Sequence, residues 1–139
     1  MSKVYWDTML FIYLLEGNRQ FGPAVKAIYS RMRLRGDSLY TSYLSLGEIL
    51  AGSPRSSPTA QMVRQGFAEM KVQLLSFDGG AVDTFASLRA VQKLATADAI
   101  HLACAASKSV DLFLTGDKQL TKQIVPGVQF ISSIETSPI

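Results

Sequence analysis

The stretch Ala95-Thr96-Ala97-Asp98-Ala99-Ile100-His101-Leu102-Ala103-Cys104-Ala105-Ala106 indicates a helix with almost no polar face. A helix that is apolar all round is normally buried, so we expect this one to lie inside the protein. Asp98 stands in its first turn, where burying a carboxylate is costly unless a donor or a cation meets it. The fold must therefore bring a partner to Asp98.

The chain has 139 residues, 47% of them hydrophobic and 18% charged, which is typical of a globular protein and not of a disordered one. This length fits a single domain spanning residues 1–139. The single cysteine, Cys104, cannot form an internal disulfide and suits a reducing, cytoplasmic setting. Lys3 precedes the first short apolar run, so we expect no signal peptide, and no apolar stretch approaches the ~20 residues that cross a membrane.

Strand and helix patterns alternate along the whole chain. We expect strands at 4–6, 38–41, 72–77, 110–114 and 128–131, and helices at 9–16, 22–35, 43–51, 59–71, 81–91, 95–108 and 118–124. Asp7-Thr8 and Ser42 are the expected N-caps of the first and third helices. The alternation predicts an α/β fold in three layers, with a central parallel sheet of about five strands and helices on both faces.

Three further acids stand at unusual places. Asp7 and Asp117 each follow an apolar strand, and ligands of open α/β sheets bind beyond the carboxyl ends of the strands. Either residue taken alone is more simply an N-cap, just as Asp98 alone is a first-turn acid favoured by the helix dipole. Glu48 is harder to explain, because its helix face is otherwise apolar and no Lys or Arg is adjacent in the sequence.

Together, the four acids favour a metal site. Neighbouring carboxylates repel one another and stay ionised only if a cation joins them. Oxygen ligands select Mg²⁺ or Mn²⁺, whereas zinc prefers the His and Cys that this chain scarcely has. A hard divalent ion suits phosphodiester hydrolysis, which points to a nuclease or a phosphatase. The net charge of +3 fits an enzyme acting on a polyanion but fits a soluble, modestly basic domain equally well.

Four segments carry a resemblance to a known family. The chain resembles the PIN domain, and more narrowly the small VapC-type toxins of prokaryotic toxin–antitoxin pairs, in Val4-Tyr5-Trp6-Asp7-Thr8, Ser45-Leu46-Gly47-Glu48-Ile49-Leu50, Thr96-Ala97-Asp98-Ala99-Ile100-His101-Leu102-Ala103 and Leu112-Phe113-Leu114-Thr115-Gly116-Asp117-Lys118-Gln119-Leu120. The resemblance covers nearly the whole chain and keeps the four acids in the family's order.

The resemblance implies a Mg²⁺- or Mn²⁺-dependent endoribonuclease that cuts RNA, is inhibited by a small antitoxin protein and often forms a homodimer. Asp7 and Asp98 would be the principal metal ligands, with Glu48 and Asp117 completing the acidic cluster. Thr115 matches the small hydroxyl residue that the family places just before the last acid. Lys118 and Gln119 stand where some relatives have a further acid, so a single-ion mechanism stays open.

Other interpretations remain. A non-catalytic PIN-fold module that binds RNA or protein would keep the fold without the chemistry. A phosphatase of the haloacid dehalogenase type needs a second Asp where Met9 stands, and a receiver domain needs an acidic pair and a lysine that are not evident. His101, one turn after Asp98, is either a general base or a hydrogen-bonded core residue. Five cations either track RNA phosphates or form solvated surface: Arg19, Lys26, Arg31, Arg33 and Arg35.

Overall fold

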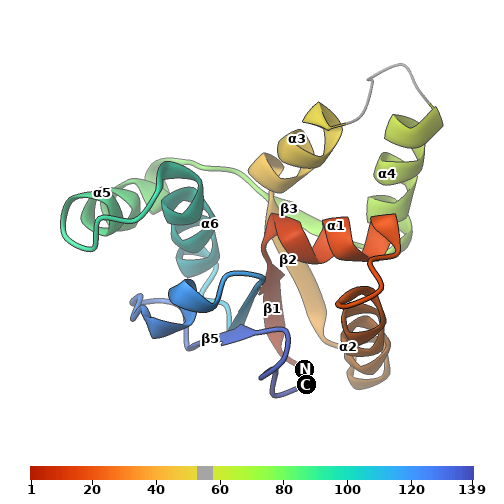
Figure 1. Ribbon diagram of the computed structural model, residues 1–139. Coiled ribbons are helices and arrows are strands. Elements are labelled where there is room, and N and C mark those ends of the chain that lie inside the picture. Colours follow the sequence, from red (N-terminus) through yellow and green to blue (C-terminus); the bar gives the residue numbers. More distant parts are fainter. Residues whose placement is uncertain (53–57) are drawn as a thin grey trace.

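A parallel sheet forms the centre of the molecule. The computed structural model describes residues 1–52 and 58–139. Within these residues, five strands pair in the order β3-β2-β1-β4-β5, all parallel (Figure 1). The strands are β1 (Lys3–Trp6), β2 (Ser38–Ser42), β3 (Gln73–Leu75), β4 (Leu112–Thr115) and β5 (Phe130–Ser133). The α/β fold class predicted from the alternation is confirmed.

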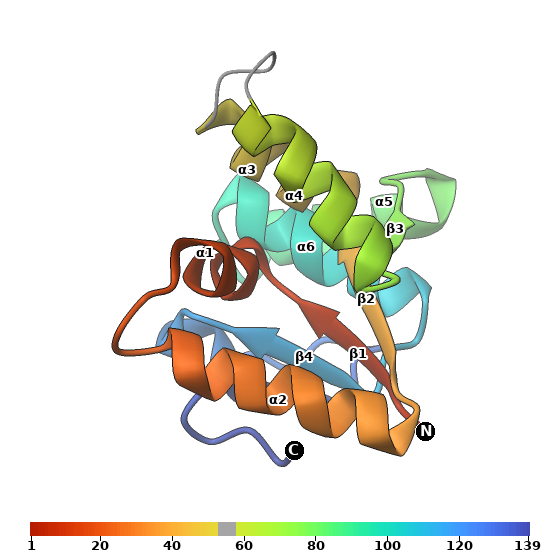
Figure 2. The ribbon, with the colours of Figure 1, turned by 90° about the vertical axis from the view of Figure 1, so that its right-hand side faces the viewer.

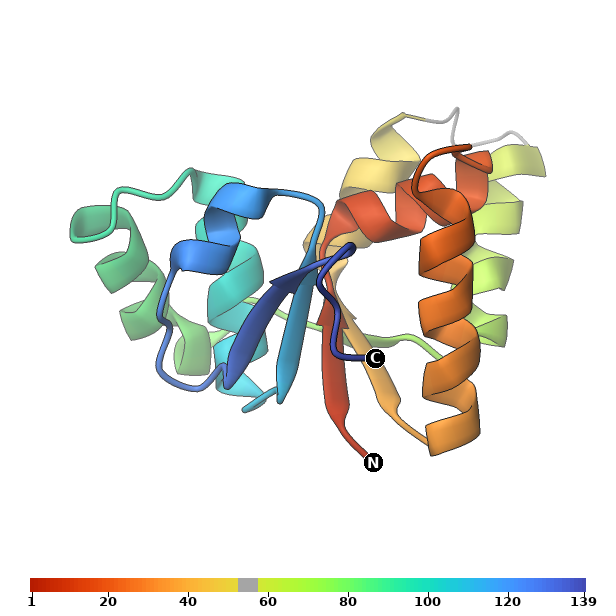
Figure 3. The same ribbon diagram turned by 60° about the horizontal axis from the view of Figure 1, so that its bottom comes forward.

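Helices cover both faces of this sheet. They are α1 (Thr8–Glu16), α2 (Gly22–Arg35), α3 (Tyr43–Ala51), α4 (Pro58–Glu69), α5 (Val82–Ala90) and α6 (Thr96–Ser107), with the 3₁₀ turns η1 (Gly79–Ala81) and η2 (Lys118–Lys122). Helices α5 and α6 lie on one side, and α1, α2 and α4 on the other (Figures 1 and 3). Figure 2 shows the second side, with these three helices in front of the strands. Helix α3 contacts both α1 and α6, so it joins the two sides above the strand ends.

The central strand β1 divides the core into two clusters. Val4 and Trp6 point to the side of α1 and α2, whereas Tyr5 points to the side of α6, and all three are fully buried. On the first side, Trp6 packs against Phe11 at a ring-centroid distance of 5.1 Å. On the second, Tyr5 stacks on Phe113 at 5.0 Å. The period-2 alternation of a strand therefore feeds both helix layers from one short segment.

The buried apolar helix predicted at 95–108 is confirmed as α6 (Thr96–Ser107). In α6 the buried residues include Ala99, His101 and every position from Leu102 to Ala106. Small alanine side chains let this helix lie close to the sheet. No helix among residues 1–52 and 58–139 is long and apolar enough to cross a membrane.

Several predicted boundaries were wrong. The strand expected at 128–131 runs from Phe130 to Ser133. It begins later because residues 125–128 form a turn, in which the Val128 N–H donates to the Val125 carbonyl. Gly127 makes that turn possible with φ +96°, and a Cβ there would lie 2.8 Å from the Ala106 carbonyl oxygen. The strands expected at 72–77 and 110–114 are Gln73–Leu75 and Leu112–Thr115, and the helix at 118–124 is the shorter turn η2.

Ser42 is the N-cap residue of α3, as expected, but its side chain makes no capping hydrogen bond. Ser42 pairs with Leu75 as the last residue of β2, and its buried, extended backbone leads straight into α3. The expected cap at Asp7 is present, because its side chain accepts a hydrogen bond from the Met9 N–H. The expected loop at Gly52–Pro58 lies largely outside the described residues.

Candidate functional site

Asp7 stands where β1 ends and α1 begins, and three protein donors hold its buried carboxylate. Oδ1 accepts from the Met9 N–H at 3.1 Å, and Oδ2 accepts from the Thr115 hydroxyl at 2.5 Å and from the Gly116 N–H at 3.1 Å. Burial raises the pKa of Asp7 above its ordinary value, although these donors act in the opposite direction. Asp7 is thus both the N-cap that its position suggested and a rigidly oriented carboxylate.

Thr115 connects the Asp7 and Asp117 segments. Strands β1 and β4 are neighbours, and Thr115 ends β4 in a fully buried position. Its hydroxyl donates to Asp7 and accepts from the Asp117 N–H at 2.9 Å. Gly116 lets the chain approach this closely, because a Cβ there would lie 3.0 Å from the Met9 Cβ. Asp117 itself is exposed and caps η2 through the Gln119 N–H at 2.9 Å.

Glu48 projects from α3 and finds its partners on distant elements. Its Oε1 accepts from the Thr8 hydroxyl at 2.6 Å and lies 3.2 Å from His101 Nε2. The Glu48 side chain is 40% exposed, whereas that of His101 is 6% exposed. The acid that had no partner near it in the sequence is therefore tethered by α1 and α6.

Asp98 lies half-buried in the first turn of α6. Burial is the largest cause of its raised pKa, and the nearby charges of Asp117 and Glu48 raise the pKa further. His101 acts in the opposite direction. The repulsion shows that Asp98 shares one electrostatic environment with two of the other acids.

Three of the four acids open onto one hollow. Asp7, Glu48 and Asp98 line a space of about 330 Å³ at the carboxyl end of β1, between α1, α3 and α6. The other lining residues are Thr8, Met9, Ile12, Ala97 and His101. Asp117 is not in this lining and acts on the site through its charge and its link to Thr115. Within the described part of the chain, no Lys or Arg forms an ion pair with any of the four acids.

The donor set suits a hard divalent cation. Carboxylate and hydroxyl oxygens are what Mg²⁺ and Mn²⁺ prefer, and the mutual repulsion at Asp98 is what a cation would relieve. As the side chains stand, no three His, Cys, Asp or Glu residues in the described ranges form a ready metal-binding group. Asp7 and Asp98 are the residues that would hold the ion, with Glu48 and Asp117 beside them.

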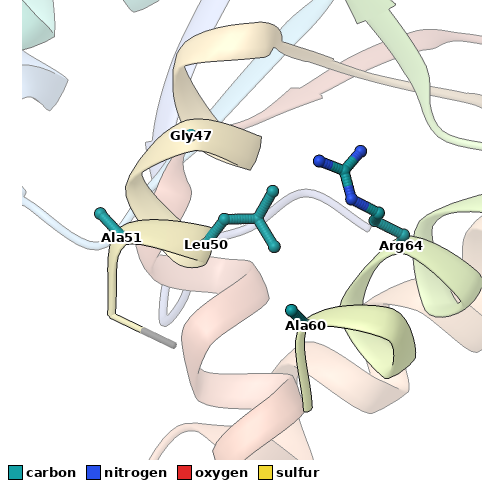
Figure 4. Close-up of a pocket in the computed structure, with 5 residues that line it drawn as sticks. All are labelled: Gly47, Leu50, Ala51, Ala60 and Arg64. Atoms are coloured by element: carbon teal, nitrogen blue, oxygen red, sulfur yellow. The ribbon is translucent and has the colours of Figure 1, made fainter. Parts of the chain in front are cut away.

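A larger hollow elsewhere has different chemistry. It measures about 370 Å³, lies between α3 and α4, and is lined by Gly47, Leu50, Ala51, Ala60 and Arg64. Leu50 and Arg64 extend into the space between the two helices (Figure 4). None of its lining residues within the described ranges is an acid or a histidine, so it is not a candidate metal site.

The buried partners of Glu48 were the part of the site that sequence reasoning missed. His101 is hydrogen bonded and buried, as its core interpretation predicted, but Thr8 and Tyr5 were not expected beside it. The only sequence signal was spacing, since Thr8 follows Asp7 directly and His101 lies one helical turn after Asp98.

The arginines near the end of α2 lie away from the acids. Arg35 approaches Asp37, just before β2 begins, at 3.2 Å, and Arg31 donates to the Ile139 carbonyl at 3.0 Å. These contacts are near the amino ends of the strands, whereas the acids lie at the carboxyl ends. The solvated-surface interpretation suits these two residues.

The chain belongs to the PIN domain family, because the sequence model of that family matches residues 4–123. A comparison with curated protein sequences found no significant match. The family that the sequence motifs suggested is therefore confirmed.

Solved structures with a similar fold come from toxin–antitoxin complexes. VapBC2 from Rickettsia felis, bound to a DNA fragment from its promoter, aligns with a TM-score of 0.69 and 14% identity over 94% of this chain and 98% of the other. A toxin–antitoxin complex from Klebsiella pneumoniae aligns with a TM-score of 0.65 and 21% identity, over 90% of this chain and 94% of the other. VapBC-5 from Mycobacterium tuberculosis aligns with a TM-score of 0.60 and 19% identity, over 94% of this chain and 98% of the other. At these identities the similarity concerns the fold.

Proposed function

We propose that this protein is a Mg²⁺- or Mn²⁺-dependent endoribonuclease and the toxin of a cytoplasmic toxin–antitoxin pair. One observation carries the proposal: Asp7, Glu48 and Asp98 line a single hollow at the carboxyl end of the sheet, without a Lys or Arg ion pair from the described residues. Asp117 adds its charge, and Thr115 supports the cluster.

The chain's own residues supply orientation and charge. When bound, a divalent ion activates water and stabilises the charge that develops on a phosphate oxygen. Asp7 is fixed by three donors, and such restraint is what places a ligand accurately. Asp98 lines the same hollow from the opposite helix layer. An RNA phosphate would therefore bind in this hollow beyond the strand ends, with acids from both layers around it.

The first experiment measures RNA cleavage with purified protein in Mg²⁺ or Mn²⁺, with and without a chelator. We expect cleavage that chelation abolishes and that Asp7→Asn and Asp98→Asn each reduce by at least about 100-fold, because each removes a ligand charge. Asp83→Asn is the matched control, since Asp83 is an exposed acid on α5 that does not line the acidic hollow. Undiminished cleavage by both site variants would reject the proposal. RNA binding that survives both substitutions, without cleavage by the parent, would identify the non-catalytic module instead.

An apolar hollow beside the acids supports an antitoxin partner. It measures about 260 Å³ between α1, α3 and α4, and it shares Ile12 and Glu48 with the acidic hollow. Leu15, 44% exposed, and Ile49 also line it. An apolar segment of the antitoxin would cover this surface and close the site. Leu15→Arg should weaken binding of the antitoxin while leaving RNA cleavage intact.

We also propose that the free protein is a homodimer, and light scattering of the free protein tests this.

A further inference from the structure

A chain of hydrogen bonds runs from the core to Glu48. The Tyr5 hydroxyl lies 2.8 Å from His101 Nδ1, and His101 Nε2 lies 3.2 Å from Glu48 Oε1 and 3.3 Å from Thr8 Oγ1. The Thr8 hydroxyl lies 2.6 Å from the same Glu48 oxygen. Tyr5 is fully buried and His101 is 5% exposed, so solvent does not compete for these groups.

The direction of each hydrogen bond follows from the number of protons available. An ionised carboxylate only accepts, so the short contact at 2.6 Å uses the single hydroxyl proton of Thr8. His101 Nε2 then faces two oxygens with no proton to offer it, and it must itself donate. In a neutral imidazole, Nδ1 is therefore the acceptor, and the Tyr5 O–H donates to it.

These bonds leave the two oxygens of Glu48 in different situations. Oε1 receives two donors, from α1 and from α6, whereas no hydrogen bond to Oε2 is formed within the described residues. The side chain is 40% exposed and lines the acidic hollow. Tethering one oxygen restricts the carboxylate, and the other oxygen, which receives no donor from the described residues, is available to an ion or its bound water in the hollow that Glu48 lines.

We propose that Tyr5, His101 and Thr8 are positioning residues that hold Glu48 for the metal, with Tyr5 fixing the imidazole tautomer. The inference rests on the proposed metal-dependent function and adds to it three residues that act through Glu48. His101 acts through Glu48 and is not a general base in this arrangement, because its Nε2 proton already points at a carboxylate and its Nδ1 faces the core.

A matched control is a buried hydroxyl outside this network. Ser133 ends β5, is 4% exposed, and its hydroxyl lies 2.9 Å from that of Thr136. Ser133→Ala removes this hydrogen bond without altering a partner of Glu48, His101 or Tyr5. It should lower the melting temperature and leave metal affinity unchanged.

The test is calorimetric titration of the metal-free protein with Mn²⁺, accompanied by RNA cleavage assays. His101→Leu should weaken Mn²⁺ binding about 10-fold or more, the range seen when an outer partner of a metal ligand is lost. His101→Gln, which retains an N–H donor, should recover part of the affinity. Tyr5→Phe, which removes only the hydroxyl, should give a smaller loss and serves if His101→Leu does not fold.

A double-variant comparison decides whether His101 acts through Glu48. In a Glu48→Gln background, His101→Leu should cause no further loss of Mn²⁺ affinity. An equal loss in both backgrounds, or a loss in Ser133→Ala as large as in His101→Leu, would overturn the inference. A parent protein that binds no Mn²⁺ and cuts no RNA would instead reject the proposed function itself, together with this inference.

Discussion

At the scale of single residues, burial and repulsion between the acids of this site lower the stability of the metal-free protein at neutral pH. Asp98 has a raised pKa because it is partly buried and lies near the charges of Asp117 and Glu48. A carboxyl group of this kind binds its proton more tightly in the folded state than in the unfolded state. Stability from this group is therefore present in acid and is lost as pH rises from the ordinary Asp pKa through the folded one.

Asp98→Asn should consequently stabilise the metal-free protein at neutral pH while abolishing cleavage. Thermal melts in chelator between about pH 4 and pH 7 measure this, because Asp98 ionises above an unfolded pKa of about 3.9. The melting temperature of the variant minus that of the parent should grow as pH rises. A constant difference across this range would show that Asp98 is not under electrostatic strain.

Thr115 offers a second test at the same scale. Thr115→Val removes the donor to Asp7 and the acceptor for the Asp117 N–H, both in a buried position. The free energy of unfolding should fall by about 1.5–3 kcal/mol, as for hydrogen bonds to charged groups. Thr115→Ser keeps the hydroxyl and should retain most of the stability and cleavage in denaturant and activity measurements. A larger loss in Thr115→Ser, which lacks the methyl group, than in Thr115→Val, which keeps it, would mean that the methyl group matters more than the hydroxyl.

At the scale of elements, two glycines should respond in opposite ways to the same substitution. Gly127→Ala places a Cβ 2.8 Å from the Ala106 carbonyl at a φ of +96°, so we expect a loss of about 1–3 kcal/mol. Gly66→Ala lies inside α4 with nothing within 4 Å of the added Cβ, so we expect a gain of about 0.5–1 kcal/mol. Urea denaturation of both variants measures the contrast, and a loss at Gly66 would contradict it.

The elements also show where sequence reasoning succeeds. β1, α1 and α6 were predicted almost to the residue, because their apolar patterns and caps are local signals. The start of β5 was missed because it depends on how tightly Gly127 packs against α6. Asp7, Glu48 and Asp98 were singled out because an acid in apolar surroundings needs a partner. The partners of Glu48 were missed because Thr8 and His101 are 40 and 53 residues away in the chain.

At the scale of the whole molecule, the site joins the two helix layers. Asp7 and Glu48 come from the side of α1 and α3, and Asp98 comes from α6. An ion held between them would stabilise the folded state only, by about 2.7 kcal/mol at a concentration 100 times its dissociation constant. Melts with Mn²⁺ should show this increase in the parent and not in Asp7→Asn. The same increase in both proteins would place the ion elsewhere.

The close packing of α6 against the sheet has a consequence for how this protein could be modified. Its buried face is built from residues such as Ala99, Ala103 and Ala105, each with no exposed surface. A bulkier side chain at any of them would push the helix outwards, and Asp98 would travel with it although no group near the hollow had changed. The position of Asp98 in the hollow could thus be adjusted in small steps by changing the volume of side chains beneath the helix.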